Sequence, residues 1–567
     1  MSNNARLLLH KKISQVLQDG ESKSNIVASL LNLRFDKSSR KLLFSLPLRS
    51  RHHDIRKDVS KFSKNDSEDF LERVEISQKK PELHFELYRD HYVKNLLDSI
   101  QAKVVPPEFM CEQPKNILVD FSSPNIAKPF HVGHLRSTMI GNYIANINNY
   151  FKNNVKRINY LGDWGTQFGF VQLGLSLSRV SEETLKKHPI ETLYKAYIYA
   201  HKLAEDDPNI ADQAREVFRK LENGDDSSLS EWESFRKYTI EELDRTYNRL
   251  GVEFDEYEWE SMYSINASRN VIAELQRLNL LHTDSQDKKV IQLNEKRCVT
   301  IIKSDGSSLY ITRDIAAAIS RYEKNRFDTM YYVVDNAQTD HFINLIGVLS
   351  AMKLPWADRL KHVKFGKIKG MSTRKGTAVF LQDFLDEVKA VMKEKQMQSP
   401  TTKVNLDYDD PSTEILGVSA VIINDLKHKR HQDYEFDWNK ALEMKGDTGI
   451  TLQYAHCRLV SLEENSGATI ASECIPSLLT EPTAEDLLYI IGKFDEAVIK
   501  SYQELEPYTL VHYLFQLSHA TSKALKVLRI KGEPTELANQ RLLLMNSARK
   551  ILAQGMKLLG LKPLNKM

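Results

Sequence analysis

Residues 117–134 read ILVDFSSPNIAKPFHVGH, and this stretch decides the fold of the chain. The apolar run Ile117–Val119 predicts a strand that ends at Asp120 and Phe121. Apolar residues then recur every four positions, which predicts a helix: Leu135, Met139, Tyr143, Ile147 and Phe151. A second apolar run, Val155–Tyr160, completes a strand–helix–strand unit, and such units build parallel sheets.

The start of the predicted helix suits a nucleotide triphosphate. Free backbone N–H groups and the helix dipole favour phosphate at a helix N-terminus, and ligands of open α/β sheets bind beyond the strand ends. His131 and His134 flank Gly133, which has no Cβ, so a flat adenine can lie against the backbone there. The alternative for this HxGH spacing is a histidine pair that caps the helix or lies at the surface.

The composition describes an ordinary globular chain with several cores. It has 567 residues, 41% of them hydrophobic, and no run of eighteen apolar residues that predicts a membrane span. The spacing of the four cysteines predicts neither a disulfide framework nor a metal site: Cys111, Cys298, Cys457 and Cys474. The residues predict no metal ligands.

The net charge is only +3, but basic residues gather near the N-terminus. Between Arg34 and Lys64 there are ten Lys or Arg residues against three Asp or Glu. They form either a patch that faces phosphate or a solvated basic surface. The first eighteen residues contain Arg6, Lys11 and Lys12 and no acid, as in an organelle-targeting segment.

Composition shifts divide the chain into three domains, over 1–106, 107–440 and 441–567. The first is an accessory α/β module that has apolar runs at 42–48 and 83–87 and ends at Pro106-Pro107. The second contains the strand–helix–strand unit, a charge-rich helical insertion over about 181–278 packed beside the sheet, and further strands over 299–303 and 330–334. The third is helical, with long amphipathic helices marked by two sets of residues: Leu510, Leu514, Leu517, Leu525 and Leu528; Leu544, Ala548, Ile551, Leu552, Leu558 and Leu559.

Three further stretches share the predicted crevice. Residues 159–169 read NYLGDWGTQFG at the end of the second strand, where Trp164 and Phe168 are expected in the core. In LYITRD at 309–314, Tyr310 and Asp314 share one face if the segment is helical, and Gln338 follows the strand over 330–334. Residues 370–376, GMSTRKG, form a basic loop able to close over phosphates.

Together these stretches resemble the arginyl-tRNA synthetases, which are class I aminoacyl-tRNA synthetases, from about residue 110 to Met567. HVGH is similar to the family's HIGH motif, and GDWGTQFG and SDGSSLYITRD resemble stretches of the arginine enzyme. Downstream matches lie at 433–438, 446–448, 452–456 and 555–560. The chain is most similar to the mitochondrial forms.

The resemblance implies a Rossmann-like α/β catalytic domain with helical insertions, an N-terminal accessory domain that binds tRNA, and an all-α anticodon-binding domain. It implies activation of L-arginine by ATP with Mg²⁺, followed by transfer to tRNA(Arg). The residues that it assigns fall into four groups: His131, His134, Lys128, Arg374 and Lys375 for catalysis; His131, Gly133, His134, Met371 and Ser372 for ATP; Asp120, Ser123, Asn125, His134, Tyr310, Asp314 and Gln338 for arginine; Tyr454, Arg458, Tyr513 and Met567 for tRNA.

The sequence departs from the family pattern at two places. Asp120 stands where many relatives have Glu, which is one methylene longer, so its contact with arginine is expected to be water-bridged or lost. In the KMSKS-like loop, Gly370 and Thr373 replace the two lysines. Lys128, upstream of HVGH, stands where a lysine is thought to compensate.

The resemblance also implies a monomer in the mitochondrial matrix, with the cytoplasm as the alternative and no membrane partner. Two other functions stay open at this stage. One is a different HxGH nucleotidyltransferase, although such chains are usually shorter and lack the helical C-terminus. The other is an RNA-binding paralogue that kept the fold without the activity.

Overall fold

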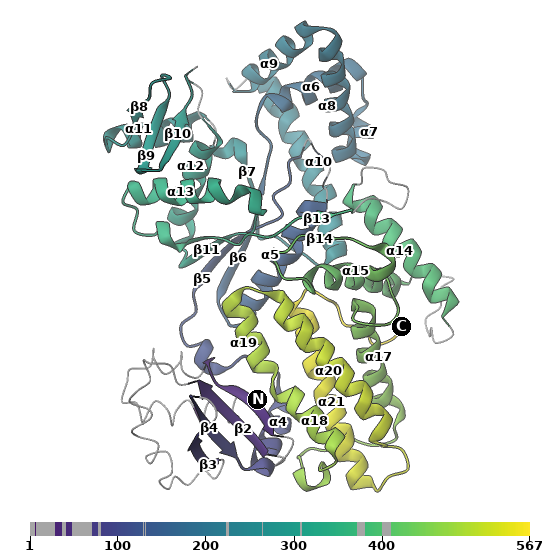
Figure 1. Ribbon diagram of the computed structural model, residues 1–567. Helices are drawn as coiled ribbons and strands as arrows, with labels where there is room; N and C mark the ends of the chain where they lie inside the picture. Colours follow the sequence, from purple (N-terminus) through teal and green to yellow (C-terminus); the bar gives the residue numbers. More distant parts are fainter. Residues whose placement is uncertain are drawn as a thin grey trace.

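The computed structural model describes residues 6, 9, 29–36, 41–47, 71–77, 81–126, 128, 130, 132–222, 226–263, 265–304, 306, 309–370, 380–399 and 410–567. The molecule is elongated (Figure 1). A parallel sheet lies at its middle, a helical bundle at one end, and the N- and C-terminal regions side by side at the other.

The central sheet confirms the predicted strand–helix–strand unit. Its five strands are all parallel in the order β12-β11-β5-β6-β7: β5 (Asn116–Asp120), β6 (Asn154–Leu161), β7 (Glu256–Trp259), β11 (Thr329–Tyr332) and β12 (Leu360–His362). Helix α5 (Val132–Tyr150) connects β5 to β6. The chain runs outward from β5 to β7 and then returns to the other side of β5, so the strand order reverses beside β5.

The helical insertion predicted over about 181–278 is present, but two details of the prediction are wrong. It is interrupted by β7, which pairs in parallel with β6 from Ile158 opposite Glu256 to Leu161 opposite Trp259. Its first helices pack against one another at the far end of the molecule rather than beside the sheet (Figure 1). The helices of this region are α6 (Thr166–Ser178), α7 (Glu182–Lys187), α8 (Pro189–Asp206), α9 (Pro208–Glu222), α10 (Asp226–Leu250), η4 (Glu260–Tyr263) and α11 (Ile265–Arg277).

A small antiparallel sheet precedes β11. Its strands are β8 (His282–Thr283), β9 (Lys289–Asn294) and β10 (Arg297–Ile302), so the strand predicted over 299–303 exists but lies outside the parallel sheet. It packs in one apolar cluster with α12 (Tyr310–Asn325) and α13 (Thr339–Ala351). Two short turns complete this part: η5 (Asn336–Gln338) and η6 (Ala357–Arg359).

From residue 381 on the chain is mainly helical, and the helices predicted over 441–567 are present. A two-stranded parallel pair, β13 (Ile368–Lys369) and β14 (Tyr434–Glu435), links this part to the sheet domain. The last helix is followed by Gly560, whose φ of 83° is easily reached only without a Cβ. The helices are α14 (Leu381–Gln398), α15 (Pro411–Leu426), α16 (Trp438–Ala441), α17 (Gly449–Asn465), η7 (Pro476–Leu478), α18 (Pro482–Gly492), α19 (Phe494–Glu504), α20 (Pro507–Val527) and α21 (Thr535–Leu558).

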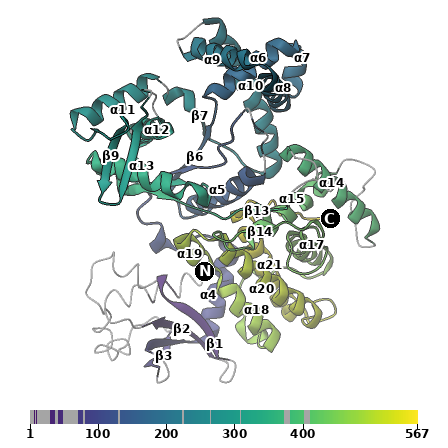
Figure 2. The same ribbon diagram turned by 45° about the horizontal axis from the view of Figure 1, so that its top comes forward.

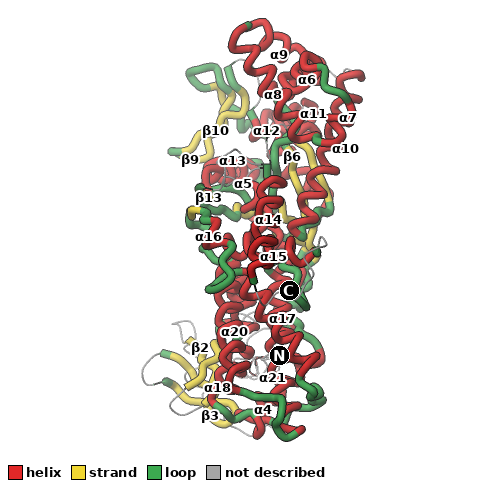
Figure 3. Tube along the Cα trace, turned by 90° about the vertical axis from the view of Figure 1, so that its right-hand side faces the viewer, coloured by secondary structure: helices red, strands yellow, loops and turns green. Residues whose placement is uncertain are grey.

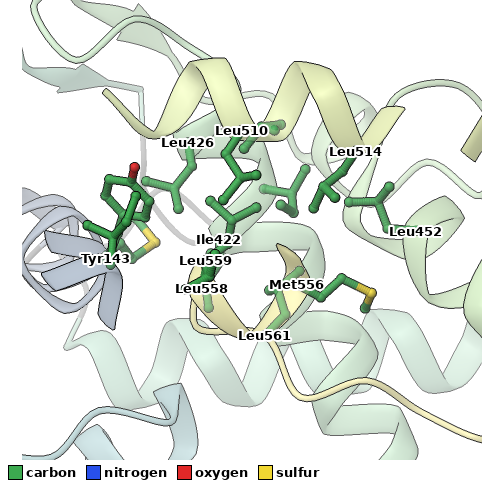
Figure 4. Close-up of a cluster of buried hydrophobic side chains, with 14 of the residues drawn as sticks. Tyr143, Ile422, Leu426, Leu452, Leu510, Leu514, Met556, Leu558, Leu559 and Leu561 are labelled. Atoms are coloured by element: carbon green, nitrogen blue, oxygen red, sulfur yellow. The ribbon is translucent and has the colours of Figure 1, made fainter. Parts of the chain in front are cut away.

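Apolar packing joins the sheet domain to the C-terminal helices. Side chains from α5, α15, α17, α20 and α21 meet in one buried cluster (Figure 4). Those labelled there are Tyr143, Ile422, Leu426, Leu452, Leu510, Leu514, Met556, Leu558, Leu559 and Leu561. The hydroxyl groups of Tyr143 and Ser501 also share a hydrogen bond. Helix α5 is therefore attached to the C-terminal helices by apolar packing and by this hydrogen bond.

The N-terminal module is α/β, as expected. An antiparallel sheet in the order β1-β2-β4-β3 precedes α4 (Arg89–Ala102). Its strands are β1 (Asn32–Asp36), β2 (Lys41–Pro47), β3 (Leu71–Ile76) and β4 (Glu82–Leu87). The module docks on the C-terminal helices: Leu33 N donates to Glu496 Oε2 at 3.0 Å, and Arg89 Nη2 donates to Leu479 O. A short η3 turn (Glu108–Met110) follows.

Most of the basic stretch 34–64 lies outside the described residues. Two of its cations pair with acids of the same sheet, Arg34 with Glu82 at 2.9 Å and Lys41 with Glu86. In the N-terminal segment, Arg6 and Leu9 are fully buried. All four cysteines are free thiols, and no helix in the described part of the chain is long and apolar enough to cross a membrane.

Candidate active site

The site lies where the strand order reverses, at the carboxyl ends of β5, β6 and β11. In open α/β sheets this reversal opens a crevice that binds ligands. The loop after β5 crosses to the end of β6 through a bridge between Asn125 and Gly162. A Cβ on Gly162 would approach Asn125 Nδ2 to 3.1 Å, so this crossing favours a glycine.

The β5–α5 loop is held in an unusual backbone conformation by buried hydrogen bonds. Ser122 and Ser123 both have positive φ, at 72° and 47°, which costs energy for residues with a Cβ. Ser122 N donates to Ser137 Oγ at 2.9 Å, and Ser123 N donates to Asn159 Oδ1 at 3.0 Å. The Tyr247 hydroxyl joins the network, 2.8 Å from Ser122 Oγ. Hydrogen bonds within the chain therefore hold the conformation of this loop.

Beneath the loop, a buried arginine of the chain itself is clamped between two carboxylates. Arg321 Nη1 donates to Asp120 Oδ2 at 3.0 Å, and Arg321 Nε donates to Glu258 Oε2 at 2.7 Å. Its guanidinium lies 4.8 Å from the ring centre of Tyr160 and 5.8 Å from that of Tyr332. The Arg321 cluster, as we call these five residues, therefore ties β5, β6, β7 and β11 to α12.

The Arg321 cluster changes the expected role of Asp120. Asp120 is 3% exposed, and its second carboxylate oxygen accepts from Ser123 Oγ at 2.9 Å. Burial raises the pKa of Asp120 to about 6, against the opposing pull of Arg321 and Ser123. Both oxygens are thus engaged within the chain, which favours an indirect role for Asp120 over a direct contact with arginine.

Helix α12 presents Tyr310 and Asp314 at the same edge of the sheet. Both lie on one helix, as expected, and Tyr310 is 63% exposed, with the Arg313 guanidinium 4.7 Å from its ring centre. Asp314 Oδ2 lies 2.8 Å from His341 Nε2 on α13. Burial raises the pKa of Tyr332, and the nearby charges of Asp120 and Asp314 raise it further. Gln338 is exposed in η5, just beyond β11.

The HxGH segment is described in part. His131 lies outside the described residues, and Gly133 and His134 form the first turn of α5. The Phe130 ring stacks on that of His134 with centres 5.4 Å apart and an angle of 8°. Lys128 is exposed in the loop before the helix. The structure therefore places His134, which is half-buried, in the first turn of a helix, where anions are favoured.

The KMSKS-like loop also lies outside the described residues, including Met371, Ser372, Arg374 and Lys375. Its two flanks are described. On the far side, Leu381 N at the start of α14 donates to Phe130 O at 3.0 Å. On the near side, Arg136 of α5 donates to Gly366 O, just before β13. Both ends of the loop are thus attached to the segment that carries the histidines.

Arg136 holds the near flank through a buried ion pair. Its Nε lies 3.1 Å from Asp425 Oδ1 on α15, and each side chain is 1% exposed. Its Nη1 also donates to Gln432 O at 2.9 Å. Burial raises the pKa of Asp425 to about 6, although the Arg136 charge lowers it. Arg136 therefore joins the start of α5 to the backbone before β13 and β14 and to α15.

In the GDWGTQFG stretch the structure confirms core positions for Trp164 and Phe168, which are 7% and 2% exposed. Asp163, which the sequence did not single out, is fully buried and accepts from Arg236 Nε at 2.8 Å and from Ser261 N at 2.9 Å. It joins β6 to α10 and η4. The stretch thus shapes the walls of the site.

The sequence did not reveal the ion pairs that carboxylates and arginines form between separate helices and strands. Glu260 of η4 lies 3.9 Å from Arg313, and burial together with the charge of Asp314 raises its pKa to about 7. Arg321, Glu258 and Asp163 were missed as well. An arginine on the apolar face of α12 was the one available signal, since a fully buried arginine needs acidic partners.

The predicted tRNA contacts differ in accessibility. On α17, Tyr454 is 42% exposed, with the Arg458 guanidinium 5.6 Å from its ring centre. Tyr513 is 5% exposed and donates to Ile490 O at 3.0 Å, so its burial argues against a tRNA contact. Met567 packs partly buried against the core.

The C-terminal tail is tied to α17 by side chains from the 452–456 stretch. Gln453 Nε2 donates to Lys562 O at 2.9 Å, and Leu564 N donates to Gln453 Oε1 at 2.8 Å. His456 Nδ1 lies 2.7 Å from Leu564 O. This stretch therefore fixes the end of the chain beside the helix that carries Tyr454.

The fold and the site define a class I aminoacyl-tRNA synthetase. Residues 97–438 match the family model of the class I tRNA synthetase catalytic domain of the arginine type, and residues 452–567 match that of the DALR anticodon binding domain. The chain therefore belongs to the arginine–tRNA ligases.

Similar proteins support the same assignment. The chain is 42% identical over 494 residues to the probable mitochondrial arginine–tRNA ligase of Mus musculus, covering 86% of this chain and 85% of that protein. It is 38% identical over 514 residues to the cytoplasmic arginine–tRNA ligase of Saccharomyces cerevisiae, covering 88% and 84%. The solved arginyl-tRNA synthetase of Thermus thermophilus shares the fold, with a TM-score of 0.81, 21% identity and coverage of 99% and 100%.

Proposed function

We propose that this arginine–tRNA ligase forms arginyl-adenylate from L-arginine and ATP and then esterifies the 3′ end of tRNA(Arg). In the first step, a carboxylate oxygen of arginine attacks the α-phosphorus of ATP, and the bond to the β-phosphate breaks to release pyrophosphate. In the second, a ribose hydroxyl of the terminal adenosine attacks the arginyl carbonyl and AMP leaves. The observation that carries the proposal is the gathering of Asp314, Tyr310 and the α5 N-terminus at one edge of the sheet.

Charge complementarity supports arginine as the amino acid. A guanidinium is planar and always charged, and carboxylates bind it through charge-assisted hydrogen bonds. We assign this contact to Asp314, with Tyr310 alongside the substrate's aliphatic stem, Gln338 across from them, and Ser123 and Asn125 at the amino acid's backbone. Asp120 acts through Ser123, whose hydroxyl it orients.

For ATP, we assign the phosphates to His131 and His134, with the adenine against Gly133 and the loop residues Met371, Ser372, Arg374 and Lys375 closing over them. Donors at a helix start stabilise the charge that builds up on phosphoryl oxygens. Mg²⁺ would arrive on the triphosphate, whose oxygens are the hard ligands that it prefers. The protein's own part is then positioning.

Lys128→Ala is expected to slow adenylate formation by about 10²-fold while ATP affinity changes less than about threefold, because its charge acts on the transition state. A single-turnover assay with tRNA present measures the first value, and equilibrium binding measures the second. Lys115→Ala, at another exposed lysine just before β5, is the control. An unchanged single-turnover rate would remove Lys128 from the catalytic group.

The KM for arginine is expected to rise about fourfold as the pH falls from about 7 to about 5.5, the ratio set by one group with a pKa near 6. Protonated Asp120 no longer orients Ser123 as a charged acceptor. The same proton has the opposite effect on the stability of the fold, which is greater at low pH than at high pH. Because the folded state takes up this proton before the unfolded state does, Asp120 disfavours folding increasingly as the pH rises from about 4 to about 6. Steady-state measurements of the KM for arginine against pH test the first expectation. In the Asp120→Asn variant the rise in KM between about pH 7 and about pH 5.5 should be absent.

Pyrophosphate exchange with each of the twenty amino acids, with and without tRNA, tests the whole proposal. Exchange with arginine alone, followed by charging of tRNA(Arg), is the expected outcome. Exchange with no amino acid under either condition would contradict it.

For the compartment, we propose the mitochondrial matrix, on the strength of the basic N-terminus and the mitochondrial relatives. The burial of Arg6 and Leu9 supports the cytoplasmic alternative, because a segment removed on import cannot also fill the core. Fractionation of cells that express the full chain with a C-terminal tag would separate the two.

A further inference from the structure

A basic groove lies where the N-terminal module meets the last helix of the chain. It holds about 330 Å³, far more than the roughly 10–15 Å³ that one water molecule needs. Its walls are the end of α4 with the residues after it and the last turns of α21, which lie against each other (Figure 3). Hydrogen bonds from Gln101 Nε2 to Asn546 Oδ1 and Ser547 Oγ hold the two walls together.

Four cations and no acid line the groove: Lys103, Arg549, Lys550 and Lys557. Arg549 Nε lies 2.7 Å from Glu463 Oε1, and Glu463 is not among the residues that line the groove. Among the described residues, none of the three lysines has a carboxylate within ion-pair distance. Instead, Lys550 Nζ donates to two oxygens of Gln101, each at 3.0 Å.

The crowding of cations is unfavourable in the free protein. Burial and the neighbouring charge of Arg549 lower the pKa of Lys550. An anion in the groove would relieve this repulsion, so the groove is complementary to phosphate.

The lining also indicates which part of a nucleic acid fits. No aromatic ring is among the lining residues, so the groove offers no platform on which a base could stack. Lysines that contact phosphates position a nucleic acid but do not read its sequence. The expected ligand is therefore a run of backbone phosphates.

We infer that the groove between α4 and α21 binds the phosphate backbone of the tRNA, through Lys103, Lys550 and Lys557. This inference rests on the proposed charging of tRNA(Arg). The N-terminal module and the C-terminal helices each supply one wall, so the groove exists only because the two are docked together. It also assigns tRNA affinity to a place away from the predicted contacts at Tyr454.

The variant Lys103→Glu/Lys557→Glu tests the groove. Both side chains are exposed, so the fold should persist, as checked by thermal melting. Filter binding of tRNA(Arg) over a salt series should show about tenfold weaker binding near 0.15 M salt, and a slope of log K against log salt shallower by roughly 1.5, the value for two lost phosphate contacts. The weakening should be the same for tRNAs with altered anticodons. The double Lys→Arg variant should behave as wild type.

Lys202→Glu is the matched control, because this exposed lysine lies on α8 at the opposite end of the molecule. It should keep the wild-type slope. Acetylation of Lys103 and Lys557, followed by mass spectrometry, gives a direct readout, and tRNA should protect both. An unchanged slope in a folded Glu variant, or protection by inorganic phosphate but not by tRNA, would overturn the inference. If even the wild-type protein charges no tRNA(Arg), the proposed function fails instead.

Discussion

Arg321→Met is expected to lower the free energy of unfolding of the sheet domain by about 3–5 kcal/mol, the usual result of removing one partner from a buried ion pair. Arg321 is 1% exposed and satisfies both Asp120 and Glu258. Without it, two buried carboxylates face each other across the ends of β5 and β7. Urea unfolding followed by tryptophan fluorescence measures the loss, read from the first transition because large chains unfold in steps.

The same variant should also raise the KM for arginine, since Asp120 would no longer hold Ser123 in place. Arg277→Met is the matched control, because this arginine is exposed on α11 and, within the described part of the chain, pairs only with Glu274 of the same helix. Adding Asp120→Asn and Glu258→Gln to Arg321→Met should restore part of the stability, because neutral side chains need no counter-charge. A single variant as stable as wild type would show that the Arg321 cluster does not hold the strands together.

Asp314→Asn is expected to lower kcat/KM for arginine by about 30- to 150-fold, which corresponds to about 2–3 kcal/mol for a charge-assisted hydrogen bond. The KM for ATP should change little, because the phosphates bind at the α5 end of the crevice. Discrimination against citrulline should narrow, since an amide no longer demands a charged partner. Steady-state charging assays with both amino acids measure these changes.

Two further variants separate substrate binding from local structure. Asp340→Asn removes an exposed acid of α13 that pairs with Arg297, and it should leave arginine kinetics unchanged. His341→Gln removes the internal partner of Asp314. If His341→Gln reproduces the full loss in kcat/KM, Asp314 acts by holding α13 rather than by binding arginine.

The part of the crevice that was predicted to bind the nucleotide could be recognised from the local pattern of apolar residues. The strand over 117–120, the helix from 132 and the returning strand depend on apolar periodicity and on the turn between them, all of which are written within fifty residues. The long C-terminal helices followed for the same reason, and both α20 and α21 have the predicted apolar faces.

Strand β7 could not be predicted in this way. Its sequence, Glu256-Tyr257-Glu258-Trp259, places charges in a region that reads as helical and polar. Glu258 is nevertheless 3% exposed, because Arg321 reaches it from a helix more than sixty residues further on. A buried acid can be anticipated only when its partner is known.

The site residues also differ in whether local sequence or distant contacts determine their position. Tyr310 and Asp314 share a face because they are one helical turn apart, which spacing alone determines. Whether a conspicuous side chain is free depends on its neighbours. Asp120 is engaged by Arg321, and Tyr513 lies in the core rather than on the surface.

The sequence by itself thus determined the parallel α/β unit, the helical C-terminal region and the family, because each depends on contiguous residues. The tertiary structure alone decided which carboxylates remain available to a substrate, how α5 is tied to β13 and α15 through Arg136, and that α4 and α21 form a basic groove. The physical reason is that electrostatic pairing and burial act between residues that are distant in sequence, and their partners are chosen only when the chain has folded.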